Sequence, residues 1–155
     1  MTLLRTTSDH ADFQTLVGAL DTYLTSVNGS DDAYYRQFNK IDALRYVVVA
    51  YVDDPAVTGQ AVPVGCGAFK PFDDQATEIK RMYVDPAYRG QGIARAILAE
   101  LEGWSREIGY VACVLETSIK LPEAVQLYTR WGYERTPNYG QYIGMPDSLC
   151  FRKSL

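Results

Sequence analysis

The stretch that decides the fold runs from Glu78 to Ile108, and its centre reads Val84-Asp85-Pro86-Ala87-Tyr88-Arg89-Gly90-Gln91-Gly92-Ile93-Ala94. Residues 78–84 alternate as a β-strand does, and Pro86 then removes a ladder donor and turns the chain. Gly109 is a typical residue just past the end of a helix. The apolar residues before it have the spacing of one helix face: Ile93, Ile97, Leu98, Leu101, Trp104 and Ile108. The pattern predicts a strand, a glycine-containing turn and a long amphipathic helix.

The turn has the features of an anion-binding site. The first N–H groups of a helix have no acceptor within the helix, and the helix dipole adds partial positive charge there. Gly90 and Gly92 carry no Cβ, so a ligand can approach the backbone closely, and Arg89 adds a fixed positive charge. A lone Gly-x-Gly would indicate only a strand-to-helix turn. Arg89, Ala94 and the upstream Glu78 favour a site for phosphate or pyrophosphate.

At these residues the sequence resembles the GNAT superfamily of acyl-CoA-dependent N-acyltransferases. The pyrophosphate loop of that family, Arg/Gln-x-x-Gly-x-Gly/Ala, is matched by residues 89–94 without a mismatch. Residues 127–133 are similar to a second signature, Leu-Tyr-x-x-x-Gly-Phe/Tyr. The third glycine of a dinucleotide fingerprint and the Gly-Lys-Ser/Thr of a P-loop are both missing from this turn. The resemblance covers the second half of the chain, from Glu78 onward.

Length and composition describe an ordinary protein of one domain, residues 1–155, with 47% hydrophobic and 22% charged residues. The net charge of −4 argues against nucleic acid as the main partner, and we expect no membrane partner and a cytoplasmic location. The cysteines Cys66, Cys113 and Cys150 lack metal-ligand spacing, so we expect no metal and buried thiols at Cys66 and Cys113. The single histidine, His10, is expected at the surface or as a helix cap.

The order of elements predicts an α/β (α+β) three-layer sandwich, in which helices cover both faces of a mixed, mostly antiparallel, twisted sheet of about seven strands. Helices are expected from an N-cap at Ser8 or Asp9, within 31–40, over 93–108 and from Pro122. The expected strands lie near residues 1–7, 44–52, 62–69, 78–84, 110–117, 133–135 and 149–153.

The resemblance implies where the donor and the catalytic groups lie. It places the pantetheine arm along the backbone of the central strand at Met82, Tyr83 and Val84. The pyrophosphate falls on the loop and helix start formed by Arg89, Gly90, Gln91, Gly92, Ile93 and Ala94. It also makes Tyr128 the acid that protonates the leaving thiolate, for which the alternative is a packed aromatic residue on an amphipathic helix.

Glu78, six residues before Val84, is the candidate base, because an amine with a pKa near 10.4 must lose a proton before it attacks. Some family members use no dedicated base, so a solvated charge or a partner for Lys80 or Arg81 stays the alternative. Glu116 and Thr117 end a strand where an acceptor would approach, and an exposed polar strand end explains them equally well.

The function that the resemblance implies is an N-acetyltransferase. It would move an acetyl group from acetyl-CoA to a primary amine of a small molecule, amino acid or peptide by direct attack in a ternary complex. The alternative is a non-catalytic acyl-CoA-binding or sensing module of the same fold. Tyr128 beside an intact loop favours the enzyme. Exposed strands near the C-terminus leave a homodimer open.

Overall fold

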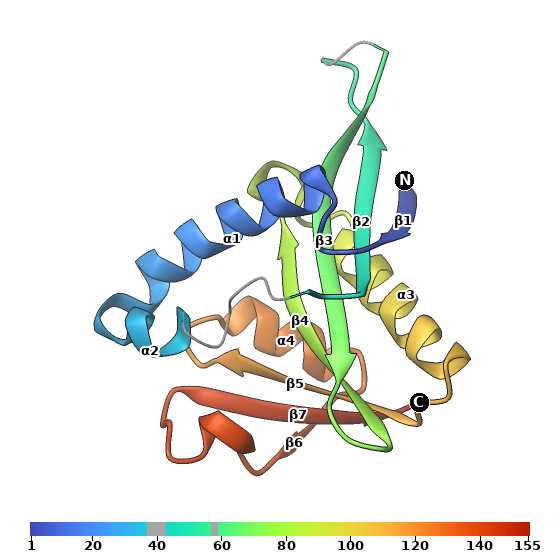
Figure 1. Cartoon of the computed structure of the whole chain (residues 1–155). Helices are drawn as coiled ribbons and strands as arrows, with labels where there is room; N and C mark the ends of the chain where they lie inside the picture. The colour runs from blue at the N-terminus through green and yellow to red at the C-terminus, as the bar shows by residue number, and fades with distance from the viewer. Residues whose placement is uncertain (37–42, 57–58) are drawn as a thin grey trace. The chain divides into compact units, whose positions relative to one another are not determined.

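The computed structural model describes residues 1–36, 43–56 and 59–155. The helices are α1 (Ala11–Asn28), α2 (Asp32–Arg36), α3 (Ile93–Glu107) and α4 (Pro122–Arg130), with short 3-10 turns η1 (Gly29–Asp31), η2 (Pro86–Tyr88) and η3 (Gly140–Tyr142) (Figure 1). The strands are β1 (Thr2–Thr6), β2 (Tyr46–Asp53), β3 (Ala61–Pro71), β4 (Ala76–Val84), β5 (Ala112–Ser118), β6 (Glu134–Thr136) and β7 (Ser148–Ser154).

The seven strands of the described residues form an open, mixed sheet in the order β1-β2-β3-β4-β5-β7-β6. Strands β1 and β2, β2 and β3, β5 and β7, and β6 and β7 pair antiparallel, whereas β4 and β5 pair in parallel. The parallel pair joins strands on either side of a helix, because parallel neighbours need a long crossover connection. The predicted mixed, mostly antiparallel sheet is confirmed.

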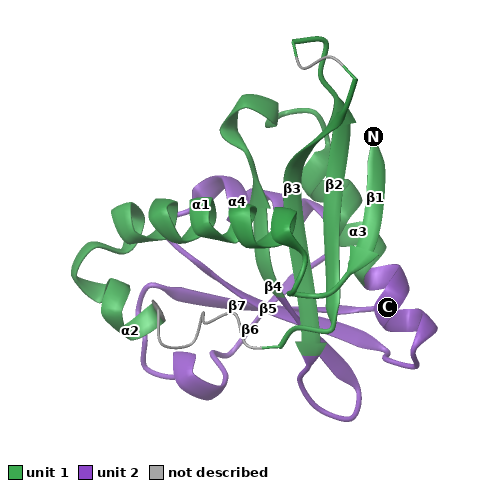
Figure 2. Cartoon of the chain, turned by 45° about the horizontal axis from the view of Figure 1, so that its top comes forward, with its two compact units in different colours: residues 1–70, 80–101 green, residues 71–79, 102–155 purple. Residues whose placement is uncertain are grey.

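The chain divides into two compact units, coloured separately in Figure 2. Unit 1 comprises Met1–Lys70 and Lys80–Leu101, and unit 2 comprises Pro71–Ile79 and Glu102–Leu155. Strand β4 and helix α3 each contribute residues to both units. A single domain over residues 1–155 stays a prediction.

Unit 1 places helices on both faces of its sheet. On one face, side chains of α1 and the first strands form a core of buried residues: Phe13, Leu16, Val17, Val47, Val49, Cys66 and Ala68. On the other face Gly67 lies under α3, since a Cβ there would come within 2.9 Å of both Ile97 and Leu101. The two glycines of β3, Gly65 and Gly67, therefore let α3 pack closely on the sheet.

Unit 2 is built on the register of β5 with its neighbours. Glu78 of β4 pairs with Val114, and Glu116 of β5 pairs with Cys150 of β7, so these four residues share one face. The opposite face carries Thr77, Cys113, Leu115 and Phe151. There the Thr77 hydroxyl lies 2.9 Å from the hydroxyl of Ser105, in the last turns of α3. The C-terminal end of α3 therefore covers this second face.

Two local predictions need correction or completion. The N-cap of α1 is His10 rather than Ser8 or Asp9: the His10 Nδ1 accepts the Asp12 N–H at 3.2 Å, while the Ser8 hydroxyl accepts the Leu44 N–H at 3.1 Å. The Ser8 hydroxyl therefore bonds to the segment that leads into β2 and does not cap α1, which begins later. The capping role expected of His10 is confirmed. The short helix expected within 31–40 is seen as α2, and residues 37–40 lie outside the described residues.

The three cysteines are free thiols and all are buried, as expected for Cys66 and Cys113. Burial raises the pKa of Cys66 to about 12, although the charge of Arg81 acts in the opposite direction. Among the described helices, none combines the length and apolar composition that crossing a bilayer requires.

Candidate functional site

The turn between β4 and α3 is held by its own polar side chains. Asp85 accepts the N–H of Ala87 at 2.9 Å through its carboxylate and donates its backbone N–H to Val64 at 2.8 Å. Pro86 opens η2, and the Tyr88 hydroxyl bonds to the Asp54 carboxylate. These contacts fix the direction in which the chain leaves the strand, and α3 begins five residues after Tyr88, at Ile93.

Gly90 and Gly92 both adopt the left-handed region, with φ of 78° and 79°. Side chains rarely tolerate this conformation, which explains glycine at both positions. A Cβ at either glycine would meet no other atom within 4 Å. The glycines therefore shape the backbone and leave open space above it, where an incoming group can reach the N–H groups of the first turn of α3.

Arg89 is exposed but held in place. Its Nε donates to the Val84 carbonyl at 2.9 Å, and its guanidinium lies 5.5 Å from the ring centre of Tyr23 and 5.8 Å from that of Tyr83. Cation–π contacts of this kind restrict a side chain without neutralising its charge. Arg89 therefore keeps a positive charge beside the loop.

The middle of β4 is strained at Arg81, whose φ of 61° is unusual for any residue with a side chain. Its side chain is only 3% exposed, and the guanidinium pairs with Asp21 of α1 at 2.8 Å. A left-handed residue costs about 1–2 kcal/mol, and such strain concentrates at binding and catalytic sites. The strained residue comes directly before Met82, Tyr83 and Val84, the predicted donor-binding segment.

In unit 2, Glu78 is 4% exposed and lies beside a tyrosine that the sequence reading did not select. The hydroxyl of Tyr139 donates to the Glu78 Oε2 at 2.7 Å. Burial is the main cause that raises the pKa of Tyr139, followed by the charge of Glu78. Glu78 is thus not the solvated strand charge that the sequence left as an alternative.

Tyr128 of α4 is also buried, with its ring edge-on to Tyr133 at 5.8 Å and tilted against Phe151 at 6.4 Å. Burial raises the pKa of Tyr128, and the charge of Glu116 adds to the effect. The phenol therefore keeps its proton throughout the neutral range. Phe151 lies on the sheet face opposite to Glu78, so the predicted acid packs on the helical side of unit 2 and the predicted base on the other side.

Glu116 lies on the same face as Glu78 and accepts the Ser148 hydroxyl at 2.8 Å. Both carboxylates raise the pKa of Tyr142, after the larger effect of burial. The structure therefore gathers Glu78, Glu116, Tyr139 and Tyr142 on one face. Sequence reasoning missed both tyrosines: Tyr139 lies within residues 137–140, which suggest only a loop, and Tyr142 follows that loop. The single available signal, twelve tyrosines in 155 residues, does not say which of them line a site.

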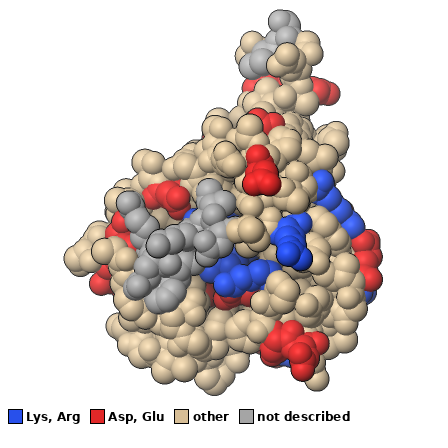
Figure 3. Space-filling view, in the orientation of Figure 1, with Lys and Arg blue, Asp and Glu red and all other residues tan. Residues whose placement is uncertain are grey.

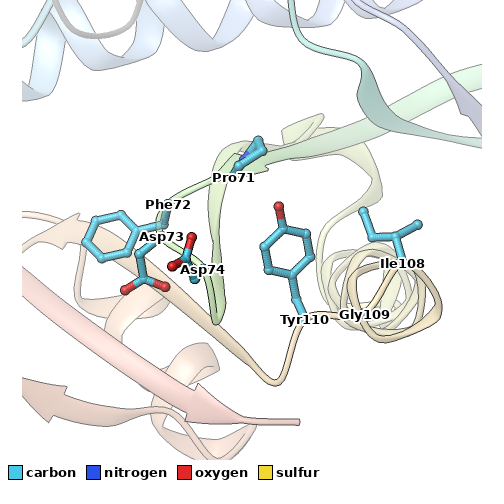
Figure 4. A pocket seen from close by; sticks show the side chains of 7 residues that line it. All are labelled: Pro71, Phe72, Asp73, Asp74, Ile108, Gly109 and Tyr110. Carbon is cyan, nitrogen blue, oxygen red and sulfur yellow. The ribbon is translucent and has the colours of Figure 1, made fainter.

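A pocket of about 480 Å³ in unit 2 is lined by none of the predicted site residues. The β3–β4 turn lines one side of it and the α3–β5 turn the other (Figure 4). Asp73 accepts the N–H groups of Gln75 and Ala76, both at 2.8 Å, so this carboxylate serves the turn itself. The loop of unit 1 and the Glu78 face of unit 2 are therefore two separate candidate regions.

The charged side chains of the described residues form no metal centre, and one face of the protein carries both signs of charge. Within residues 1–36, 43–56 and 59–155, no three His, Cys, Asp or Glu side chains are placed to hold a metal ion. On the face drawn in Figure 3, a few groups of Lys and Arg side chains are visible, and separate groups of Asp and Glu lie around them.

Comparison with known proteins agrees with this geometry. The family model described as "Acetyltransferase (GNAT) family" matches residues 14–133. The "IAA acetyltransferase" of Azospirillum brasilense is 30% identical over 142 residues, which are 90% of this chain and 88% of the relative.

Two solved structures are also similar. One, from Klebsiella pneumoniae and assigned provisionally to the acyl-CoA N-acyltransferases, shares 29% identity with a TM-score of 0.76 over 99% of this chain and 97% of its own. A GNAT family acetyltransferase from Elizabethkingia anophelis with acetyl-CoA bound has a TM-score of 0.56 and 20% identity, over 71% of this chain and 76% of its own. This second likeness shows the fold alone.

The fold and the matched family model define an acyl-CoA-dependent acyltransferase. The chain belongs to the GNAT acetyltransferase family. None of these comparisons supports the alternative of a non-catalytic acyl-CoA-binding module.

Proposed function

We propose that the protein transfers the acetyl group of acetyl-CoA to a primary amine of a small molecule, amino acid or peptide by direct attack in a ternary complex. The observation that carries this proposal is the loop of residues 89–94. Its two left-handed glycines open the backbone at the start of a 15-residue helix, beside a fixed arginine. The matched acetyltransferase family model and the 30% identical acetyltransferase of Azospirillum brasilense support acetyl as the group transferred.

The donor would be held by backbone groups more than by side chains. The amides of Gly90, Gln91, Gly92, Ile93 and Ala94 and the charge of Arg89 suit a pyrophosphate, which a helix N-terminus binds well. The open space over both glycines fits a group that must reach those amides. Met82, Tyr83 and Val84 would pair their backbone with the pantetheine amides, next to the strained Arg81.

The two catalytic roles fall to groups on different faces of unit 2. Glu78 would accept a proton from the amine, directly or through a water molecule, so that the nitrogen can form its bond to the acetyl carbon. As the carbon–sulfur bond breaks, Tyr128 would donate its hydroxyl proton toward the leaving sulfur. A backbone N–H of β4 would polarise the acetyl oxygen. Base and acid would act on two atoms, the amine nitrogen and the thioester sulfur, that are bonded to the same acetyl carbon.

The acceptor side of the proposal rests on the carboxylates of Glu78 and Glu116. They lie on one face of β4 and β5 and would attract an ammonium group before it loses its proton. An uncharged or acidic acceptor would gain nothing from this pair. We therefore expect turnover with cationic primary amines.

The experiment is an assay of thiol release from acetyl-CoA over a panel of primary amines, with the product identified by its mass. The expected result is thiol release that depends on the amine and yields an N-acetylated product. Hydroxyl-bearing compounds without an amine serve as matched controls. Absence of acetylated product across cationic amines, amino acids and peptides, with the protein folded, would contradict the proposed function.

A further inference from the structure

The loop that carries η3 brings Tyr139 onto Glu78 across 61 residues of sequence. The hydroxyl-to-carboxylate distance is 2.7 Å, and the carboxylate side chain is 4% exposed. A hydrogen bond to an ionised group is stronger than one between neutral groups and fixes the orientation of both partners. Tyr139 is therefore placed to set the geometry of this carboxylate.

The ring of Tyr139 is held by packing contacts that do not involve Glu78. It packs on a small core formed by Ala76, Ala112 and Val114. Its ring centre lies 4.7 Å from that of Phe72 and 5.7 Å from that of Tyr142, both in edge-on geometry. Such contacts hold an aromatic ring at a defined angle. The hydroxyl therefore has little freedom to leave the carboxylate.

The loop itself is tied down by one side chain. The amide nitrogen of Asn138 lies 3.0 Å from the Tyr142 carbonyl, 3.2 Å from the Met145 carbonyl and 3.0 Å from the Ser148 carbonyl. Asn138 thus closes the loop around η3 directly beside Tyr139. A side chain that orients another group needs a rotamer fixed by its surroundings, and this closed loop restricts the rotamer of Tyr139.

Several charged or titratable groups share the face of Glu78. Glu116 stands on β5, Cys150 and Arg152 on β7, and Tyr142 on η3. The Ser148 hydroxyl bonds to Glu116. Tyr139, whose pKa is raised by burial and by Glu78, keeps its proton through the neutral range. It therefore remains a hydrogen-bond donor at every pH at which the base would work.

We propose that Tyr139 is the positioning residue of the Glu78 base, holding one carboxylate oxygen and stabilising the ionised form that accepts the proton of the amine. This inference rests on the proposed function. In this role Tyr139 would act through Glu78, with no direct part in binding the donor or the acceptor.

The test compares pH profiles of kcat/KM for the wild type, Tyr139→Phe and Tyr133→Phe. Tyr139→Phe keeps the ring and removes the donor, so the carboxylate takes up its proton more easily. The acidic limb is expected to move up by about one pH unit, with the dissociation constant of acetyl-CoA unchanged. Tyr133→Phe is the matched control, because the Tyr133 hydroxyl donates to Glu102 at the same 2.7 Å within the same unit. It is expected to lower stability without moving the limb.

A second measurement follows the carboxyl carbon of Glu78 by NMR, assigned with Glu78→Gln. Its titration midpoint is expected to rise in Tyr139→Phe and to stay at the wild-type value in Tyr133→Phe. The inference would be overturned if Tyr139→Phe moved neither the acidic limb of the kcat/KM profile nor the Glu78 titration midpoint, or if both variants shifted them equally. In either case, turnover by the wild type would leave the proposed function standing. A wild type that acetylates no amine would remove both.

Discussion

Tyr128 has its ring packed against Tyr133 and Phe151, so replacement by phenylalanine removes only the hydroxyl. If that hydroxyl protonates the leaving sulfur, Tyr128→Phe should lower kcat by about 100-fold or more while the dissociation constant of acetyl-CoA stays the same. Stopped-flow thiol release and calorimetry measure the two quantities. Because the pKa of Tyr128 is raised, wild-type activity should not fall through loss of this proton below about pH 10. A variant that turns over as fast as the wild type would leave Tyr128 as a packing residue only.

Among the helices and strands, the sequence predicted best those that are specified by local periodicity and by turn residues. Pro86 and the two glycines mark the turn before α3, and strand alternation predicts β4, because period and turn residues act locally. The N-cap at His10 and the Tyr139–Glu78 contact could not be predicted in the same way. The first depends on the Leu44 N–H, which donates to the Ser8 hydroxyl, and the second joins residues 61 positions apart. Packing between distant segments decides both, and a single sequence does not encode it as a local pattern.

For the whole molecule, buried phenols and thiols make the free energy of unfolding vary with pH in the alkaline range. Burial is the largest cause that raises the pKa of each of these groups: Cys66, Tyr128, Tyr133, Tyr139 and Tyr142. The unfolded chain gives up these protons near pH 8.5 for the thiol and near pH 10 for the phenols, while the folded protein retains them. Their contribution to the free energy of unfolding is therefore fully present below those pH values. Above them the free energy of unfolding falls by about 1.4 kcal/mol per pH unit for each group that stays protonated only in the folded protein.

Urea unfolding in the presence of a reductant, between pH 7.5 and 10.5, measures this dependence. The free energy of unfolding should decline ever more steeply from about pH 9 upward. Tyr133→Phe has one phenol fewer and should show a shallower decline. A free energy that stays level to pH 10.5 would mean that these groups titrate alike in the folded and unfolded states.

Binding of acetyl-CoA on the loop of residues 89–94 is tested by calorimetric titration of Gly92→Trp with acetyl-CoA. Gly59→Trp is the matched control: Gly59 has φ of 86°, close to the 79° of Gly92, and a Cβ at either position meets nothing within 4 Å. Both variants therefore carry similar backbone strain, and only one obstructs the loop. We expect acetyl-CoA to bind to the wild type and to Gly59→Trp, and binding to be lost in Gly92→Trp while the fold is retained. Equal affinity in all three proteins would contradict this expectation.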